Sequence, residues 1–381
     1  MEAKVKQFQE AVPGSLDELI RRQLDGGQAQ PKIIVYDSLL PWALDVADRN
    51  GLAAAPFFTQ TCSVSSIYYL FREGKLTAGE EAEKELCLYG LPRLEERDLP
   101  TFVPDPEASP FLLGLLVGQF SNLERAAYVF FNTFDKLEDQ MVEWMASKWP
   151  ILTVGPTLPS MHLDKCIEDD KSYGLNLFKP NRQTCLDWLD KRQARSVIYV
   201  SFGSLAVLEQ QQMNEIAECL EKLHTHFIWV VRETEMGKLS SQFMEGNLKS
   251  GLGLVVTWCD QLDVLAHESV GCFVTHCGCN STLEALCLGV PMVGMPKWSD
   301  QPTNAKFVED VWRVGVRCRE DENGIVRKVE LERCVRVVLE DEEIRRNAAR
   351  VKEWALEAIQ DGGSSHTNIN KFVSALTTSD A

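Results

Sequence analysis

Short runs of apolar and β-branched residues alternate with amphipathic stretches along most of this chain. That alternation is typical of a parallel sheet flanked by helices, and the apolar runs fall into two series. The first series predicts strands at residues 32–36, 53–58, 127–133 and 150–154, and the second predicts strands at 196–202, 226–231, 252–257, 270–275 and 291–295. The predicted fold class is therefore α/β, with two Rossmann-like domains.

The stretches between and after these series predict the domain boundaries. Residues 156–182 carry Gly, Pro, Asp and Lys without periodicity, so we expect a linker there, between an N-terminal domain at 1–155 and a second domain at 183–360. A 3.6-residue spacing from about 329 to 376 predicts helices, with Asp-Gly-Gly at 361–363 as a stop between two of them. We expect residues 361–381 to form a C-terminal helix that packs back on the N-terminal domain.

Composition narrows the classes of partner. The chain has 381 residues, of which 45% are hydrophobic and 25% charged, as in soluble globular proteins of two domains. Its formal net charge of -17 argues against nucleic acid and against an anionic membrane surface as partners. No apolar run approaches the roughly 18 residues of a membrane span, and the first residues form no apolar signal region, so we expect a cytoplasmic location.

The cysteines raise the question of a metal site. Twelve cysteines occur without CxxC pairs, which suits reduced thiols. Cys272, His276, Cys277 and Cys279 lie close together in sequence and could suggest zinc. However, the residues up to Cys277 read as a buried strand, whose alternation sends successive side chains to opposite faces. We therefore predict no metal.

The stretch from 270 to 289 has the layout of an anion-binding site. The strand VGCFVT ends at His276, Gly278 permits close approach of the backbone, and Asn280, Ser281 and Thr282 open a helix. In doubly wound domains, ligands bind beyond the carboxyl ends of the strands, where helix N-termini offer free N–H groups. Asn280 or Ser281 can cap the helix or donate to a phosphate. The alternative is an ordinary N-cap with a packed histidine.

Two further side chains extend this pattern toward a nucleotide. Trp258 ends a predicted strand, where its ring could stack on a nucleobase, and Glu284 lies one turn into the helix, where its carboxylate could take two ribose hydroxyls. Each is weak alone, because a strand-end Trp is more often core and a helical Glu is usually solvated. Together they predict a nucleotide site.

These residues lie in a segment that resembles a known family. The stretch WCDQLDVLAHESVGCFVTHCGCNSTLEALCLGVPMVGMPKWSDQ, from Trp258 to Gln301, is similar over its full 44 residues to the signature of plant family-1 UDP-dependent glycosyltransferases. Four further segments outside this stretch or overlapping its end are also similar to the family, namely IVYDSLLPWALDVA, PFFTQ, VSFGS and DQPTNAKFVEDVW. The resemblance implies a GT-B fold, with two domains facing a cleft, and an inverting, metal-independent transfer. A hexose would pass from a UDP-sugar co-substrate to a hydroxyl or carboxyl of a small hydrophobic acceptor, without a cofactor. Gln301, by resemblance, suits glucose as that hexose. A GT-B epimerase or phosphorylase would need a different binding segment.

The resemblance also assigns roles to individual positions. Trp258 would stack on uracil, with the backbone of Cys259 at the base edge, and Gln261 and Glu284 would hold the ribose. The diphosphate would contact Ser204, His276, Asn280 and Ser281 beside Gly278. Sugar hydroxyls would contact Thr59, Asp300 and Gln301, although a strand end at Thr59 and a helix start ahead of Pro302 fit the local sequence as well.

Cys279 departs from the family pattern. It stands where the family's HCGWNS motif has Trp, so the sugar site loses an aromatic wall. Burial of such a ring contributes on the order of 1 to 3 kcal/mol, and we expect weaker donor affinity or an altered choice of sugar.

The general base is the second departure. The family uses a histidine in its first strand-to-helix loop, but the first histidine of this chain is His162. By resemblance, Asp37 is the carboxylate that orients that base, although it could equally be a helix N-cap. We therefore expect an N-terminally truncated chain whose incomplete first sheet, lacking the central strand of a 3-2-1-4 order, has a gap or an unpaired edge. The alternative function is then a catalytically impaired UDP-sugar-binding fragment.

Overall fold

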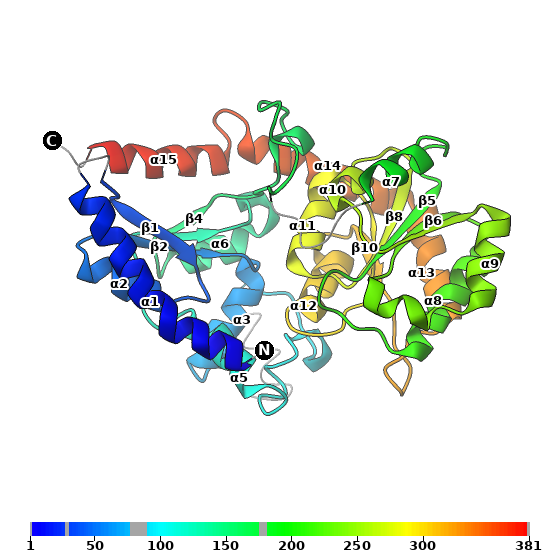
Figure 1. Ribbon diagram of the computed structural model, residues 1–381, viewed down its shortest axis with the longest axis horizontal. Coiled ribbons are helices and arrows are strands. Elements are labelled where there is room, and N and C mark those ends of the chain that lie inside the picture. The colour runs from blue at the N-terminus through cyan, green and yellow to red at the C-terminus, as the bar shows by residue number, and fades with distance from the viewer. Residues whose placement is uncertain (1, 27–29, 77–89, 175–180, 379–381) are drawn as a thin grey trace. The chain divides into compact units, whose positions relative to one another are not determined.

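The chain forms two compact units, each built around a parallel sheet (Figure 1). This computed structural model describes residues 2–26, 30–76, 90–174 and 181–378. The first unit comprises Met1–Thr157 and Glu357–Ala381, and the second comprises Leu158–Leu356. The predicted α/β class with two Rossmann-like domains is confirmed.

The sheet of the first unit has the strand order β1-β2-β3-β4. Its strands are β1 (Ile33–Asp37), β2 (Ala53–Phe58), β3 (Val129–Phe131) and β4 (Ile151–Thr153), all parallel. These described strands are contiguous, so there is no gap between them, and β1 lies at an edge. Val35 in β1 is 49% exposed, as expected of an edge strand with an open face.

Helices pack on both the early and the late strands of this unit. They are α1 (Glu2–Asp25), α2 (Trp42–Arg49), α3 (Cys62–Arg72), α5 (Pro110–Gly118), α6 (Asp139–Ala146) and α15 (Ser364–Thr378), with the short 3₁₀ turns η1 (Glu96–Asp98), η2 (Leu123–Arg125) and η3 (Asp135–Leu137). The last helix, α15, lies against β4. The Phe372 ring is 4.9 Å from that of Phe130, and the Asn368 amide donates to the carbonyl of Thr153 at 3.0 Å.

The second sheet has the order β10-β9-β8-β5-β6-β7. Its parallel strands are β5 (Val197–Ser201), β6 (His226–Val230), β7 (Gly253–Val256), β8 (Val270–Thr275), β9 (Met292–Gly294) and β10 (Gly315–Arg317). Because β5 pairs with both β6 and β8, the strand order reverses there. Ligands of doubly wound domains bind at such a switch point.

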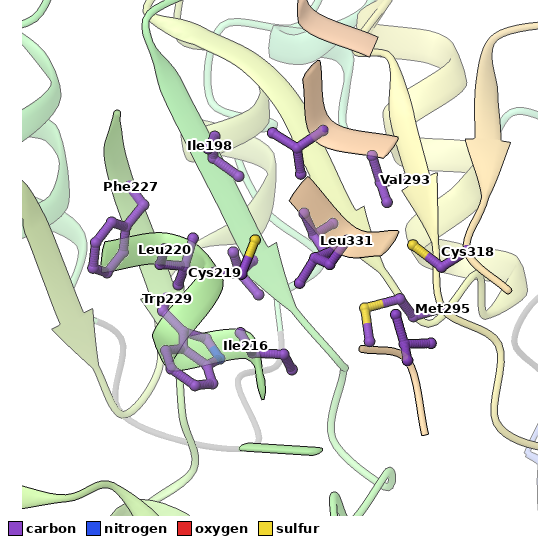
Figure 2. Close-up of a cluster of buried hydrophobic side chains, with 14 of the residues drawn as sticks. Ile198, Ile216, Cys219, Leu220, Phe227, Trp229, Val293, Met295, Cys318 and Leu331 are labelled. Atoms are coloured by element: carbon purple, nitrogen blue, oxygen red, sulfur yellow. The ribbon is translucent and has the colours of Figure 1, made fainter. Parts of the chain in front are cut away.

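A large apolar core supports this sheet. Figure 2 shows side chains of β5, β6, β9, α8 and α13 meeting on one face, among them Ile198, Trp229, Val293, Ile216 and Leu331. The helices and turns of the unit are η4 (Ser160–His162), α7 (Arg182–Leu189), α8 (Gln210–Leu223), η5 (Glu233–Lys238), α9 (Ser241–Ser250), α10 (Gln261–Leu265), α11 (Cys279–Leu288), α12 (Gln301–Lys306), the π-turn η6 (Phe307–Val311) and α13 (Lys328–Glu340). Helix α14 (Glu342–Ile359) contains the division between the units.

The structure differs from the sequence prediction at three places. Strand β10 was not predicted, and the C-terminal helical region has an additional break at Asp341, between α13 and α14, besides the expected stop at 361–363. Most of the predicted linker belongs to the second unit from Leu158 onward. The remainder of that linker, at 175–180, lies outside the described residues. Over the described residues, none of the helices combines the length and apolarity that crossing a bilayer requires.

Candidate nucleotide-binding site

A cavity of about 270 Å³ opens at the carboxyl ends of the strands of the second unit. Residues after β5, at the end of β6, after β7 and in the first turns of α11 contribute to its wall, so the cavity lies at the switch point of the sheet. It is lined by Tyr173, Tyr199, Ser201, Gly203, Ser204, Val230, Trp258, Cys259, Asp260, Gln261, Leu262, Asn280, Ser281 and Glu284. Seven of the predicted donor-binding residues therefore surround one space, namely Ser204, Trp258, Cys259, Gln261, Asn280, Ser281 and Glu284.

Glu284 and Gln261 form the polar floor of this cavity. The Gln261 amide nitrogen donates to Glu284 Oε2 at 2.7 Å and to Ser281 Oγ at 2.9 Å. The Tyr199 hydroxyl in turn donates to Gln261 Oε1 at 3.2 Å, and the Tyr173 hydroxyl donates to Glu284 Oε1 at 2.9 Å. Burial raises the pKa of Glu284, while the bonds from Gln261 and Tyr173 act to lower it.

Trp258 and Cys259 form a second part of the wall. Trp258 follows β7, and its backbone carbonyl accepts a hydrogen bond from the amide of Asn181 at 3.0 Å, which fixes the chain at this point. Cys259 is buried, and its sulfur lies 3.3 Å from the Tyr199 hydroxyl. The indole is thus presented from a backbone that is anchored on both sides.

Helix α11 begins two residues earlier than a cap at Asn280 requires, and three earlier than a cap at Ser281 requires. Gly278 is the N-cap, with φ -62° and ψ 147°, and it has no side chain with which to cap. The predicted capping by Asn280 or Ser281 is therefore wrong, because both lie inside the first turn, where their side chains turn outward from the axis. The Cys279 amide donates to Asp300 Oδ2 at 3.1 Å instead.

His276 follows β8 and packs between two glycines. A Cβ atom at Gly203 would lie 2.8 Å from the imidazole, and one at Gly278 would lie 2.6 Å from it, so both positions require glycine for this packing. Gly203 also has φ +70°, which favours glycine. Burial lowers the pKa of His276 to about 4, so the ring is neutral near pH 7. Its Nδ1 has no hydrogen-bond partner within the described residues.

Asp300 and Gln301 are buried and do not line the cavity. Asp300 Oδ2 accepts from the Asn304 amide at 2.6 Å, and burial raises the pKa of Asp300. Gln301 Oε1 accepts from the backbone amides of Lys297 and Trp298 at 2.9 and 3.1 Å. These bonds hold the two side chains at the N-terminus of α12. This agrees with the alternative interpretation of Asp300 and Gln301 as a helix start ahead of Pro302.

Asp37 and Thr59 belong to the first unit, where Asp37 is the last residue of β1 and Thr59 follows the neighbouring strand β2. Asp37 is exposed, and its Oδ1 accepts from the amide of Leu39 at 2.9 Å in a tight turn. It does not cap α2, whose N-cap is Pro41, so that alternative for Asp37 is wrong.

In the part of the chain that the structure describes, no three His, Cys, Asp or Glu side chains are grouped as a metal site.

Sequence reasoning missed the two tyrosines of the cavity. Tyr199 lies in the middle of the buried strand β5, where its hydroxyl could have been expected to need a polar partner. Tyr173 lies in the stretch that was predicted as a linker, where no periodicity singles it out.

Comparison with known proteins agrees with this geometry. Residues 127–354 match the family model of UDP-glucoronosyl and UDP-glucosyl transferases. The chain is 50% identical to UDP glycosyltransferase 9 of Catharanthus roseus, over 99% of this chain and 81% of the relative, and 46% identical to a mogroside I-E synthase of Siraitia grosvenorii, over 99% and 83%. Among solved structures it is similar to Os79 of O. sativa in complex with UDP, with a TM-score of 0.93, 38% identity, and coverage of 98% of this chain and 84% of Os79.

The fold and the site thus define a glycosyltransferase of GT-B type that uses a UDP-sugar. The chain belongs to the plant family-1 UDP-dependent glycosyltransferases. The predicted truncation is not confirmed by these comparisons and stays a prediction.

Proposed function

We propose that this chain transfers a hexose, glucose in the first instance, from a UDP-sugar to a hydroxyl or carboxyl of a small hydrophobic acceptor, with inversion and without a metal. The observation that carries the proposal is the cavity in which Trp258, the Gln261–Glu284 pair and the start of α11 surround one space. Its volume of about 270 Å³ is at the lower end of small-ligand pockets, as suits one nucleotide.

Each part of UDP has a matching group in this cavity. The indole of Trp258 stacks on uracil, with the backbone of Cys259 at the base edge, and the Gln261–Glu284 pair takes the ribose hydroxyls. The diphosphate lies at the N-terminus of α11, where free N–H groups and the positive end of the helix dipole favour an anion. Ser204, His276, Asn280 and Ser281 complete its surroundings beside Gly278. A neutral His276 donates one hydrogen bond there and supplies no charge.

The sugar end of the proposal rests on Asp300 and Gln301, with Cys279 replacing an aromatic wall. Asp300 and Gln301 are already engaged by backbone amides in the structure. Sugar hydroxyls would therefore bind to carboxylate and amide groups whose orientation is fixed in advance, which favours selection among hydroxyl stereoisomers. Cys279→Trp tests the missing wall, with a tighter UDP-glucose dissociation constant as the expected result and an unchanged constant as the contrary one.

The chemistry of the acceptor depends on the base. An alcohol or phenol loses a proton as it attacks the anomeric carbon, and a carboxylate is a much weaker base than an imidazole for that step. A carboxylic-acid acceptor is already ionised near pH 7. We therefore propose that this chain favours ester-forming over ether-forming transfer.

A second candidate is a protein that binds a UDP-sugar without turning it over. One observation favours it: within the described residues, the Asp37 carboxylate is engaged by the Leu39 amide and not by an imidazole. The donor cavity is the same in both candidates, so binding alone does not separate them.

The test pairs binding with product formation. Calorimetric titration with UDP is followed by product detection from UDP-glucose with a matched phenol and benzoic acid. We expect micromolar binding that Glu284→Gln weakens, and a glucose ester with β configuration from benzoic acid in excess of the phenyl glucoside. Binding without either product selects the second candidate, faster reaction of the phenol contradicts the ester preference, and absence of binding contradicts the donor site.

A further inference from the structure

Tyr173 brings a phenol into the donor cavity from outside the signature segment. Its side chain is 53% exposed overall, yet its hydroxyl reaches Glu284 and donates to Oε1 at 2.9 Å. The residues before it, 158–174, belong to the second unit, where the Ser160 amide donates to Asp170 Oδ2 at 2.7 Å and His162 lies 3.8 Å from Asp263. Tyr173 is therefore held against the cavity from a segment with its own anchors.

The Glu284 carboxylate is held from both sides. Oε1 accepts from Tyr173 and Oε2 accepts from Gln261, whose own orientation is fixed by Tyr199 and Ser281. An ionised carboxylate offers about four lone-pair sites, so one site on each oxygen remains. These two sites match the two neighbouring hydroxyls of a ribose.

We propose that Tyr173 is a positioning residue for ribose recognition, which orients the Glu284 carboxylate so that each oxygen keeps one lone pair directed into the cavity. This inference rests on the proposed UDP-sugar function. The terminal torsion of a glutamate is broad, so a carboxylate held by Gln261 alone can rotate and presents its second oxygen less consistently. Preorganisation of this kind contributes to affinity because less side-chain conformational entropy is lost on binding.

The experiment compares UDP with 2′-deoxy-UDP, which lacks one of the two hydroxyls. Native protein should bind UDP on the order of tenfold more tightly, because a hydrogen bond to a charged group is lost with the hydroxyl. In Tyr173→Phe, this ratio of dissociation constants should fall at least threefold, because UDP loses affinity while 2′-deoxy-UDP is affected less. Near-ultraviolet circular dichroism checks that the variant is folded.

Asp170→Asn is the matched control. It removes a negative charge from the same segment, while its amide oxygen can still accept from the Ser160 backbone amide and the Glu284 contacts are left in place, so the ratio should stay at its native value. An unchanged ratio in Tyr173→Phe, an equal loss for both nucleotides, or the same fall in Asp170→Asn overturns the inference alone. Native protein that binds no UDP overturns the proposed function and the inference with it.

Discussion

Glu284 is a buried carboxylate, and its protonation should be visible in donor binding. Burial raises its pKa above the ordinary value near 4.3, so it takes up a proton at a higher pH than an exposed glutamate. A protonated carboxyl accepts fewer hydrogen bonds from ribose. We therefore expect the affinity for UDP-glucose to be constant near pH 7 and to fall as the pH is lowered through the raised pKa of Glu284.

UDP-glucose suits this measurement because each of its phosphates is doubly substituted and has no second ionisation, unlike the terminal phosphate of UDP, which titrates near pH 6. Asp260 and His276 also titrate on the acid side, the former with a raised pKa and the latter near 4. Glu284→Gln separates them, because it should weaken binding near pH 7 and flatten the dependence on the acid side of neutrality. An acid limb that survives unchanged in this variant would assign it to another group.

At individual positions, sequence reasoning placed the cavity residues that carry a distinctive side chain next to a strand end. Trp258, Gln261 and Glu284 were predicted as a group and do surround one space. The exact helix start was missed because the N-cap is Gly278, which has no capping side chain, and the Cys279 amide donates to Asp300, which is distant in sequence. Tyr173 was missed because only a tertiary contact, with Glu284, gives it significance.

Among the elements, the loop after β5 is held by two cations from the segment after β6. Arg232 donates to the carbonyls of Ser204 and Ala206 at 2.7 and 2.5 Å, while Lys238 donates to that of Leu208 at 2.6 Å. Of the two cations, only Arg232 bonds to a residue that lines the cavity, namely Ser204. Arg232→Met should therefore weaken UDP binding about tenfold, since charge-assisted hydrogen bonds to the loop are lost. Calorimetry gives the constant.

Uridine and Lys238→Met are the controls for this effect. Uridine carries no diphosphate, so its affinity should change little in Arg232→Met if the loop serves the phosphates through Ser204. Lys238→Met loosens the far end of the same loop and should leave UDP affinity within about twofold of the native value. Equal weakening of uridine, or an equal effect of Lys238→Met, would contradict this role for Arg232.

Element prediction succeeded where burial leaves a pattern in the sequence. The structure has a strand at each of the nine predicted positions, and most of these strands are largely buried, so that they read as continuous apolar runs. Strand β10 is only three residues long and too short for such a run. Residues 158–174, which were predicted as part of a linker, group with the second unit, where single side-chain contacts such as that between Ser160 and Asp170 hold them without periodicity.

For the whole molecule, α15 matters because it completes the first unit from the far end of the sequence. Phe372 packs edge-to-face on Tyr128 and Phe130, at 5.4 and 4.9 Å between ring centroids. Phe372→Ala should lower the free energy of unfolding by about 2 kcal/mol, through lost burial and two aromatic contacts. Urea denaturation followed by circular dichroism measures the change.

Val373→Ala on the same helix is the comparison. Val373 is 48% exposed, so its truncation should cost no more than about 0.5 kcal/mol. If the two variants were equally stable, the aromatic contacts of α15 would contribute nothing measurable to the first unit.

The division of the first unit into two separated stretches of chain has a consequence for biosynthesis. Residues up to Thr157 leave the ribosome early, but Glu357 and the helix that follows emerge only after the entire intervening unit has been translated. Phe130 and its neighbours on the first sheet therefore stay uncovered by Phe372 throughout that interval. In such a nascent chain, the part that is synthesised first exposes apolar surface for the longest time. We therefore expect chaperones to bind mainly to this part.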